Sequence, residues 1–529
     1  MASALELKGG FFKMRKWLKR RYIVSAIVLA SVTATALSGC GGASGTKTEP
    51  SAGTGSPNKS ASSSPTAAAT PAPATISLFT EFSTAWPAKK DWGVWKWVKE
   101  ETNITINQIT ATSPESLSLA VASGEMPDVM SVFPIEVRKF GAQGAFLDLS
   151  KHMDKMPNVK AYLDAKPDIR ARVTQPDGKI YNIINDGAGA GNQSVWFYRE
   201  DVFQKNGLKA PTTWDELYAT AKKLKQLYPE SYPIVFRHGI GTLGTFAPTF
   251  GVLSDFYKDP TTGNMQYGIA DPNYKTMIEY LSKFYKEGLF PPDWLSMDYK
   301  AWTQFITANK SFITLQYIGQ IEIMNNQLKE GRLKFMAPPL GAGSKAYLPK
   351  GNYEDYGFAV ASKTANLDAS LRYLDFIYSK KGREVLSWGK EGETYTVENG
   401  KRKFKPVFKE ANDLRREAGI QTAGAYGWFD FDAWLALVKE NEQEPYVEAQ
   451  KYQFPVGNIL PNLTKEELDA TTIPSEQLYK YYATSISKFI MGETPMTQWD
   501  SFISSLNQYG LPKLLETYQT ALDRNKTGK

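Results

Sequence analysis

Hydrophobic and polar residues follow two different periods in the first part of the chain after residue 75. The runs Ile76–Phe79, Ile104–Ile109 and Val129–Phe133 have the length and the apolar or alternating character of strands. Between these runs, residues 86–101 and 114–123 have the composition and length of helices. Strands that alternate with helices at these lengths predict an α/β layer.

Later segments carry clearer helix signals. Thr213 begins one of them as a cap with Glu216 three residues on, the spacing of a capping box, and apolar residues then recur at helical spacing up to residue 228. Residues 274–287 and 367–388 are amphipathic, and residues 499–524 form two predicted helices that break at a Gly-Leu-Pro sequence.

The N-terminal region has the pattern of an export signal. Residues 13–21 are strongly basic, and the 16 residues from Tyr22 to Leu37 are almost free of charge. That apolar run is shorter than the ~20 residues that a membrane span needs. The first 13 residues fit this pattern poorly, so both Met1 and Met14 are candidates for the start of translation.

Cys40 is the only cysteine of the chain and directly follows Leu-Ser-Gly. This sequence resembles a bacterial lipobox, in which small residues precede the cysteine that receives lipid. We therefore expect residues 1–39 to be a signal peptide and Cys40 to be the lipidated mature N-terminus. The alternative is a stray thiol behind an uncleaved anchor or an ordinary signal.

Residues 40–75 consist almost entirely of Gly, Ser, Thr, Ala and Pro after the cysteine. A segment with so little to bury cannot offset the entropy lost on ordering, so we expect a disordered tether. About 450 residues remain after it, more than one hydrophobic core usually serves, which predicts two lobes.

The net charge of the whole chain is +7, but most of it belongs to the first 39 residues. These contain seven basic residues and one acidic residue, which leaves +1 for the rest of the chain. A nearly neutral mature chain offers no basic field for nucleic acid, and we expect no nucleic-acid partner.

Histidine is limited to His152 and His238, and neither lies in a metal-binding spacing or beside the cysteine. This argues against histidine-based metal sites and against Ser-His or Cys-His catalysis. We expect no cofactor, no metal and no disulfide.

Several segments together are similar to the family 1 extracellular solute-binding proteins of ABC importers, particularly the large lipoproteins of Gram-positive bacteria. The similarity runs from Ile76 to the C-terminus. Its motifs are VASGEMPDVMSV at 121–132, DGKIYNI at 177–183, WFYREDVFQKNGLKAPTTWDEL at 196–217, the stretch 356–395 that ends in WGKEGETY, and the final helices at 510–524.

The resemblance implies an α/β periplasmic-binding-protein-like fold of two lobes with a hinge and a ligand cleft between them. We expect residues 76–190 and 302–345 to form the N-lobe, and residues 191–301 and 346–529 to form the C-lobe. It also implies a monomer on the outer face of the cell membrane that hands its solute to the transmembrane permease subunits.

Some large relatives carry a calcium loop after the Trp-x-Glu-Leu helix. In this chain that place reads QLYPESYPIVF, at 226–236, which lacks the oxygen ligands that such a loop needs. The sequence DPTTGN at 259–264 has too few carboxylates to replace it, so we predict no calcium site.

Ligands of open α/β sheets sit beyond the carboxyl ends of the strands. A sugar needs aromatic surfaces with carboxylates or amides nearby. The rule selects the loops at 80–86, after Val132, at Tyr317 and at 388–395. Trp196 near the first crossing between lobes and Trp428 in a stretch that is aromatic on both helical faces are added to them. The candidate ligand contacts are Glu81, Phe82, Trp86, Phe133, Trp196, Tyr317, Trp388, Glu391, Tyr395 and Trp428.

Packing roles are the alternative for the tryptophans. We expect Trp92, Trp95 and Trp97 to be core residues, Trp214 to pack beside its helix cap, and Asp128 to be a structural turn or cap. For Trp196, Tyr317, Trp388 and Trp428 both roles stay open.

The preferred interpretation is a binding protein without catalytic activity that captures a carbohydrate, with an oligosaccharide as the expected ligand. Two alternatives remain. One is a secreted glycoside hydrolase, for which Glu391 and Glu393 would have to form an acid/base pair, although no other feature of the segment supports one. The other is a structural surface lipoprotein without a ligand.

Overall fold

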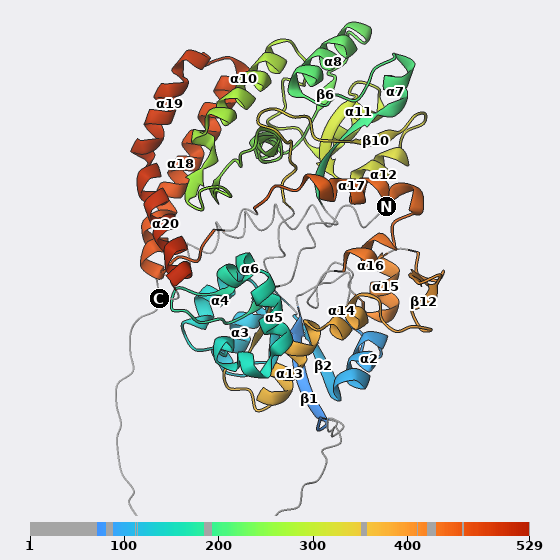
Figure 1. Ribbon diagram of the computed structural model, residues 1–529, viewed down its shortest axis with the longest axis vertical. Coiled ribbons are helices and arrows are strands. Elements are labelled where there is room, and N and C mark those ends of the chain that lie inside the picture. Colours follow the sequence, from blue (N-terminus) through green and yellow to red (C-terminus); the bar gives the residue numbers. More distant parts are fainter. Residues whose placement is uncertain are drawn as a thin grey trace, which may run out of the picture. The chain divides into compact units, whose positions relative to one another are not determined.

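The computed structural model describes residues 71–80, 88–111, 113, 115–184, 193–350, 357–409, 411–420, 430–456 and 460–527. The predicted signal peptide, Cys40 and nearly all of the predicted tether lie outside these residues. The described chain contains two larger β-sheets, and each has its own helices (Figure 1).

The first sheet has five strands in the order β2-β1-β3-β11-β4. Their bounds are Ile104–Thr110 (β2), Ala74–Thr80 (β1), Val129–Val132 (β3), Gly357–Val360 (β11) and Ile183–Ile184 (β4). Strand β1 is parallel to β2 and to β3, as the alternating strand and helix pattern predicts. Strand β11 is antiparallel to both of its neighbours and arrives from far along the chain.

The helices of the first lobe come from two parts of the sequence. The early ones are α2 (Gly93–Thr102), α3 (Ser116–Ser123), α4 (Pro134–Gly141), α5 (Pro157–Ala165) and α6 (Pro167–Val173), and the late ones are α13 (Leu367–Ile377), α14 (Lys380–Ser387) and α15 (Ala411–Ala418). Trp92, Trp95 and Trp97 are buried in this lobe's core, as predicted. The core therefore joins segments more than 250 residues apart in the sequence.

The second sheet has four strands in the order β10-β5-β9-β6. Their bounds are Leu333–Met336 (β10), Ser194–Arg199 (β5), Ile313–Tyr317 (β9) and Ile234–Val235 (β6). Strand β5 is antiparallel to β9 and β10, whereas β6 and β9 are parallel. The carboxyl ends of β6 and β9 therefore lie at the same edge of this sheet.

This pairing corrects the expected lobe boundaries in the second half of the chain. Residues 302–345 were expected in the first lobe, but β9 and β10 pair with β5 in the second. Residues 346–529 were expected wholly in the second lobe, but β11 pairs with β3 and β4 in the first. The sequence pattern predicts where strands lie but not which strands pair. It therefore does not show where the chain crosses from one lobe to the other.

The second lobe is built mainly from helices. They are α7 (Glu200–Lys205), α8 (Trp214–Leu227), α9 (Leu243–Phe246), α10 (Pro272–Lys286), α11 (Tyr299–Thr307), α12 (Gln320–Asn325), α17 (Glu444–Ala449), α18 (Lys465–Met491), α19 (Trp499–Leu506) and α20 (Leu511–Thr527). Helices α10, α18, α19 and α20 lie together at one side of this lobe (Figure 1). None of the helices described in the chain is both long enough and apolar enough to span a membrane.

Smaller elements complete the chain. They are the hairpins β7–β8 (Phe256–Lys258 and Met265–Tyr267) and β12–β13 (Tyr395–Glu398 and Lys401–Phe404), helix α16 (Phe431–Leu435), and 3₁₀ turns at Leu149–Lys155, Gly239–Thr242, Ala247–Phe250, Gly268–Ala270, Glu440–Glu442, Gln450–Tyr452, Met496–Gln498 and Asn507–Tyr509.

Helix α8 begins where its sequence predicts, but its cap differs in detail. The Thr213 hydroxyl accepts the Glu216 N–H at 3.1 Å, which confirms Thr213 as the N-cap. The Glu216 carboxylate instead accepts the N–H and the hydroxyl of Thr212, both at 2.7 Å. Trp214 is buried and donates its indole N–H to Thr249, so its predicted packing role is confirmed.

The predicted single helix over 367–388 is two helices, α13 and α14. Ser379 caps α14, because its hydroxyl accepts the Gly382 N–H at 2.9 Å. A Cβ at Gly382 would lie 1.9 Å from the Phe376 carbonyl oxygen, so the two helices meet at a turn too close for a side chain. The apolar periodicity continues across this turn, which hid the break.

Candidate functional site at the carboxyl edges of the two sheets

The carboxyl edge of the first sheet presents an exposed aromatic residue. Phe133 directly follows β3 and is 38% exposed, although the strand before it is largely buried. Its N–H donates to the Glu136 carboxylate at 2.9 Å, and Pro134 starts helix α4 immediately afterwards. The strand-to-helix turn therefore fixes the backbone of Phe133. Glu81, Phe82 and Trp86, which follow β1, lie outside the described residues.

Asp128 stabilises the turn that leads into β3. Its carboxylate accepts the N–H and the hydroxyl of Ser77 in β1, the hydroxyl of Thr364 and the amide of Asn366. Burial alone would raise the pKa of Asp128, but these hydrogen bonds outweigh burial and hold the pKa below its usual value. The predicted structural role of Asp128 is confirmed.

The carboxyl edge of the second sheet gathers polar and aromatic side chains. Arg237 and His238 follow β6, and Gln316 and Tyr317 end β9. Tyr317 is 38% exposed, and its ring centroid lies 6.3 Å from that of His238 in an edge-to-face arrangement. Like Phe133 in the first lobe, Tyr317 is an exposed aromatic at the end of a buried strand.

The Gln316 side chain favours one tautomer of the neutral His238 ring. The Gln316 side-chain oxygen accepts the Tyr317 N–H at 2.9 Å, so the amide NH₂ points to Nε2 of His238 at 3.2 Å. An NH₂ group only donates, so Nε2 must accept and the ring proton sits on Nδ1. Desolvation and the charge of Arg237 lower the pKa of His238, which keeps the ring neutral at pH 7.

The backbone at this edge is strained. His238 has a φ of +82° and Gly239 a φ of +52°, and the left-handed region is unfavourable for residues that carry a Cβ. A Cβ at Gly239 would lie 2.6 Å from the Leu295 carbonyl oxygen, so only glycine fits at that position. Such strain persists where the surrounding structure enforces it, which is common at binding sites.

A pocket of about 360 Å³ opens beside His238. One wall is the turn that follows His238, together with Leu295, and the other wall is a face of α18. Helix α18 contributes the phenol of Tyr479 and the hydroxyls of Thr484 and Ser487. The pocket thus combines apolar surface with groups that form hydrogen bonds with hydroxyls.

Trp196 lies in the core of the second lobe. Its ring is 1% exposed and packs against Trp214 and Phe246 at centroid distances of 6.1 and 5.3 Å. The structure does not bring Trp196 to the carboxyl edge occupied by Tyr317.

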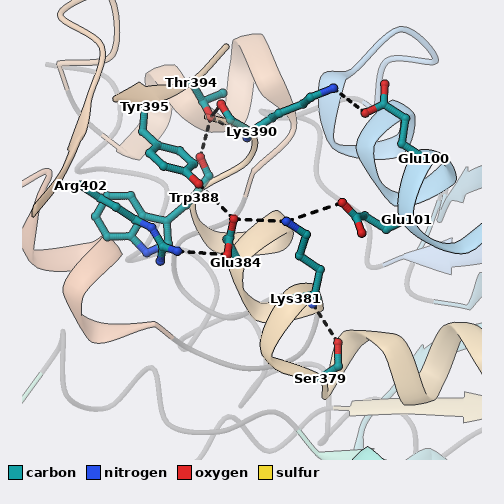
Figure 2. Close-up of polar contacts among 11 residues, drawn as sticks. Glu100, Glu101, Ser379, Lys381, Glu384, Trp388, Lys390, Thr394, Tyr395 and Arg402 are labelled. Atoms are coloured by element: carbon teal, nitrogen blue, oxygen red, sulfur yellow. Dashed lines mark hydrogen bonds and ion pairs between the residues drawn. The ribbon is translucent and has the colours of Figure 1, made fainter. Parts of the chain in front are cut away.

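Trp388 and Tyr395 are engaged within the protein (Figure 2). Both are at most 3% exposed, and the Tyr395 hydroxyl donates to Glu384 at 3.0 Å. Arg402 donates to the other Glu384 oxygen at 3.0 Å. Burial and the Glu384 carboxylate raise the pKa of Tyr395 to about 12. These contacts stabilise the segment itself and leave little of either ring available to a solute.

Glu391 and Glu393 lie in the same turn but have different surroundings. Both are exposed, and Glu393 accepts the indole N–H of Trp97 at 3.1 Å and pairs with Lys96 at 3.4 Å. Glu393 is thus occupied by contacts to α2. Trp428 lies outside the described residues.

Residues 77–384, more than half of the chain, match the model of the family described as bacterial extracellular solute-binding protein. The chain belongs to this family.

Some relatives of this solute-binding protein match it over most of its length. It is 22% identical to the fructooligosaccharide ABC transporter substrate-binding protein FusA of Streptococcus pneumoniae, over 82% of this chain and 87% of FusA. It is 21% identical to the polygalacturonan/rhamnogalacturonan-binding protein YtcQ of Bacillus subtilis, over 79% of this chain and 84% of YtcQ.

Solved structures agree with the fold. The alginate-binding protein AlgQ2, solved without calcium ion, superposes with a TM-score of 0.61 at 26% identity and covers 85% of this chain and 98% of its own. The two-lobe α/β architecture predicted from the sequence is confirmed by this likeness.

No group of three or more His, Cys, Asp or Glu side chains among the described residues of this solute-binding protein is arranged to hold a metal ion. At the position of the calcium loop expected in some relatives, the Ser231 hydroxyl and N–H both bond to the Tyr228 carbonyl. The segment closes on itself with one backbone bond and one side-chain bond.

Sequence reasoning missed Arg237, His238 and Gln316. Strand β6 has only two residues, so the hydrophobic pattern does not show where this strand ends. The residues that follow it were therefore not selected. The signal that was present is a short apolar run, Ile234–Phe236, directly followed by two cationic or titratable residues and a glycine.

Proposed function

We propose that this solute-binding protein captures an oligosaccharide between its two lobes and delivers it to the transmembrane subunits of an ABC importer. The protein would bind without catalysing a reaction. A ligand that touches both lobes favours the closed arrangement and shifts the population towards it.

The observation that carries the proposal is the matching pair of sheet edges. Phe133 in one lobe and Tyr317 in the other are each 38% exposed at the end of a buried strand. Aromatic rings accept the C–H faces of sugars, and the side chains next to Tyr317 supply partners for hydroxyls. The similar proteins FusA, YtcQ and AlgQ2 are named as binding proteins for fructooligosaccharide, polygalacturonan/rhamnogalacturonan and alginate, which supports the same class of ligand.

The binding proposal is tested by the melting temperature of the purified protein in the presence of oligosaccharides. A ligand present at about 100 times its dissociation constant should stabilise the folded state by about 3 kcal/mol. Phe133→Ala and Tyr317→Ala should each reduce this shift while leaving the melting temperature without ligand nearly unchanged. Unchanged ligand shifts in both variants would contradict the proposed site. Release of reducing sugar from a polysaccharide would contradict the absence of catalysis.

We further propose that Cys40 carries the lipid that holds the protein at the outer face of the membrane of a Gram-positive cell, where it acts as a monomer. One acyl chain binds a membrane only marginally, so more than one chain is expected. Cys40→Ala should release the protein into the medium with oligosaccharide binding intact. A Cys40→Ala protein that stays in the membrane fraction would show that the apolar run is an uncleaved anchor.

A further inference from the structure

Arg237 is half-buried and differs from the buried Arg199 of the second lobe in having no carboxylate partner among the described residues. Arg199, with a side chain 3% exposed, forms two hydrogen bonds with Asp201 at 2.8 and 2.7 Å. Such a paired geometry compensates the charge of a buried guanidinium. Among the described residues, no carboxylate forms an ion pair with Arg237. The Arg237 guanidinium also forms no hydrogen bond with any of the described residues.

Aromatic rings take the place of a counter-ion around Arg237. The guanidinium lies 5.2 Å from the ring centroid of Tyr299 and 5.9 Å from that of Trp302. Its Nε atom is shielded from solvent yet has no acceptor within the described chain. The aromatic contacts orient the guanidinium but give its Nε–H no acceptor among the described residues.

The charge nevertheless persists. Desolvation lowers the pKa of Arg237, but a guanidinium starts from a pKa so high that it remains protonated in proteins. A partly desolvated cation with unused donors has an unfavourable free energy that an anionic partner would relieve. Carboxylate geometry matches the planar fork of the guanidinium.

The position of Arg237 places this charge within the proposed binding site. It immediately precedes His238, which contacts Tyr317 and lines the 360 Å³ pocket. The Tyr299 ring that holds Arg237 is itself fixed by a hydrogen bond from its hydroxyl to Gln320 at 3.0 Å. The cation, the exposed aromatic and the pocket therefore belong to one edge of the sheet.

We propose that Arg237 binds a carboxylate of the ligand, and that the captured oligosaccharide is therefore acidic, built from uronic-acid units. This inference rests on the proposed function and specifies its ligand. A neutral sugar would leave the donors of Arg237 without an anionic partner, so the site favours the charged chain over its uncharged counterpart. The neutral ring of His238 adds no second positive charge and keeps its Nδ1 proton to donate.

Binding of two acidic probes, trigalacturonate and an alginate trisaccharide, to the full mature chain tests the proposal. Calorimetry compares each probe with its carboxyl-reduced form, which has hydroxymethyl groups in place of carboxylates. We expect at least one acidic probe to bind, and to bind about 10- to 100-fold more tightly than its reduced form. Arg237→Gln should remove most of that difference, and Arg237→Lys should retain more of it because the charge is kept.

Arg332→Gln is the matched control, because this arginine lies in the same lobe with its side chain 56% exposed. It should leave both affinities unchanged. The proposal is overturned if wild-type protein binds the reduced form as tightly as the acidic form, or if Arg237→Gln weakens both by the same factor. Binding of neutral oligosaccharides alone would overturn the acidic ligand but leave the proposed function standing, whereas no binding of any saccharide would overturn both. If Arg237→Gln does not fold, the proposal is decided by whether the wild-type protein binds the acidic probe more tightly than its reduced form.

Discussion

Single side chains hold the turns from which the candidate site is built. Asp128 connects β1, the turn before β3 and the segment before α13 through four hydrogen bonds. The family-like sequence Met-Pro-Asp-Val thus has a structural explanation, since the carboxylate must accept bonds from both sides of the turn. The position of Phe133, five residues later, depends on this turn.

Asp128→Asn should lower the free energy of unfolding at pH 7 by about 1 to 3 kcal/mol, because an amide oxygen cannot accept all four bonds. The folded-state pKa of Asp128 is depressed, so its contribution is complete above the unfolded pKa of about 3.9 and declines as the pH falls through the folded value. Urea unfolding should therefore show the gap between wild type and variant closing below about pH 4. Asp154→Asn, at an exposed aspartate, is the control and should change stability little.

Gly239 and Gly251 allow two contributions to stability to be compared: that of a left-handed backbone alone, and that of the same backbone together with a steric clash. Both have positive φ, +52° and +77°, but a Cβ at Gly251 would meet no atom within 4 Å whereas one at Gly239 would meet the Leu295 carbonyl oxygen at 2.6 Å. Gly251→Ala should cost about 1 to 2 kcal/mol for the left-handed backbone alone. Gly239→Ala should cost more, as measured by thermal unfolding, and equal losses would show that the turn at Gly239 relaxes without difficulty.

At the scale of elements, α18 is the helix that the sequence pattern did not reveal. This helix spans 27 residues and contains Pro474. Ile473, directly before that proline, is 64% exposed, so the apolar stripe of the helix is interrupted there. Its start is nevertheless well specified. Thr464 and Glu467 form a reciprocal capping box. The Thr464 N–H donates to the Glu467 carboxylate at 2.8 Å, and the Glu467 N–H donates to the Thr464 hydroxyl at 3.2 Å.

Thr464→Ala should destabilise the protein by about 0.5 to 2 kcal/mol, because the cap hydroxyl is lost from a helix that forms one wall of the pocket. Thr472→Ala is the control, since Thr472 is exposed within the same helix and only bonds back to the Leu468 carbonyl. It should change stability by less than about 0.5 kcal/mol. Chemical denaturation followed by circular dichroism measures both, and equal effects would argue against the cap as the cause.

Local elements were predictable where the local signal and the tertiary contacts agree. The strands β1, β2 and β3, the start of α8 and the break before α20 follow from periodicity, a capping threonine and a Gly-Leu-Pro sequence. Strand partners depend on segments distant in sequence, which is why β9, β10 and β11 were assigned to the wrong lobes. The role of Trp388 also depends on distant residues, because its burial is set by Phe404 and Ala433.

For the candidate site, the rule of carboxyl strand ends selected Phe133 and Tyr317, which the structure places at exposed edges. It did not select Arg237, because a strand of two residues has no recognisable period. Richness in aromatic residues was a weaker guide, since the same ring types fill the cores, as Trp196 and Trp214 do.

At the scale of the whole molecule, two lobes that share one ligand should move on binding. A saturating oligosaccharide should reduce the radius of gyration measured by small-angle X-ray scattering, because the closed arrangement is the one that contacts the ligand from both lobes. Tyr317→Ala at the same ligand concentration should show a smaller reduction. An unchanged radius with the ligand demonstrably bound would show that binding uses one lobe only.

The late return of β11 has a consequence for synthesis. While the ribosome adds residues in order, β3 lacks a partner on one side until Gly357–Val360 has emerged, by which time every strand of the other sheet has already been made. The second core is completed later still, since Leu511, Leu514 and Tyr518 belong to it. Neither half can finish folding as an early, independent unit, so the nascent chain exposes an open strand edge over hundreds of residues of elongation. Such an edge invites premature pairing with other chains, and a chaperone that covers it would raise the yield of native protein.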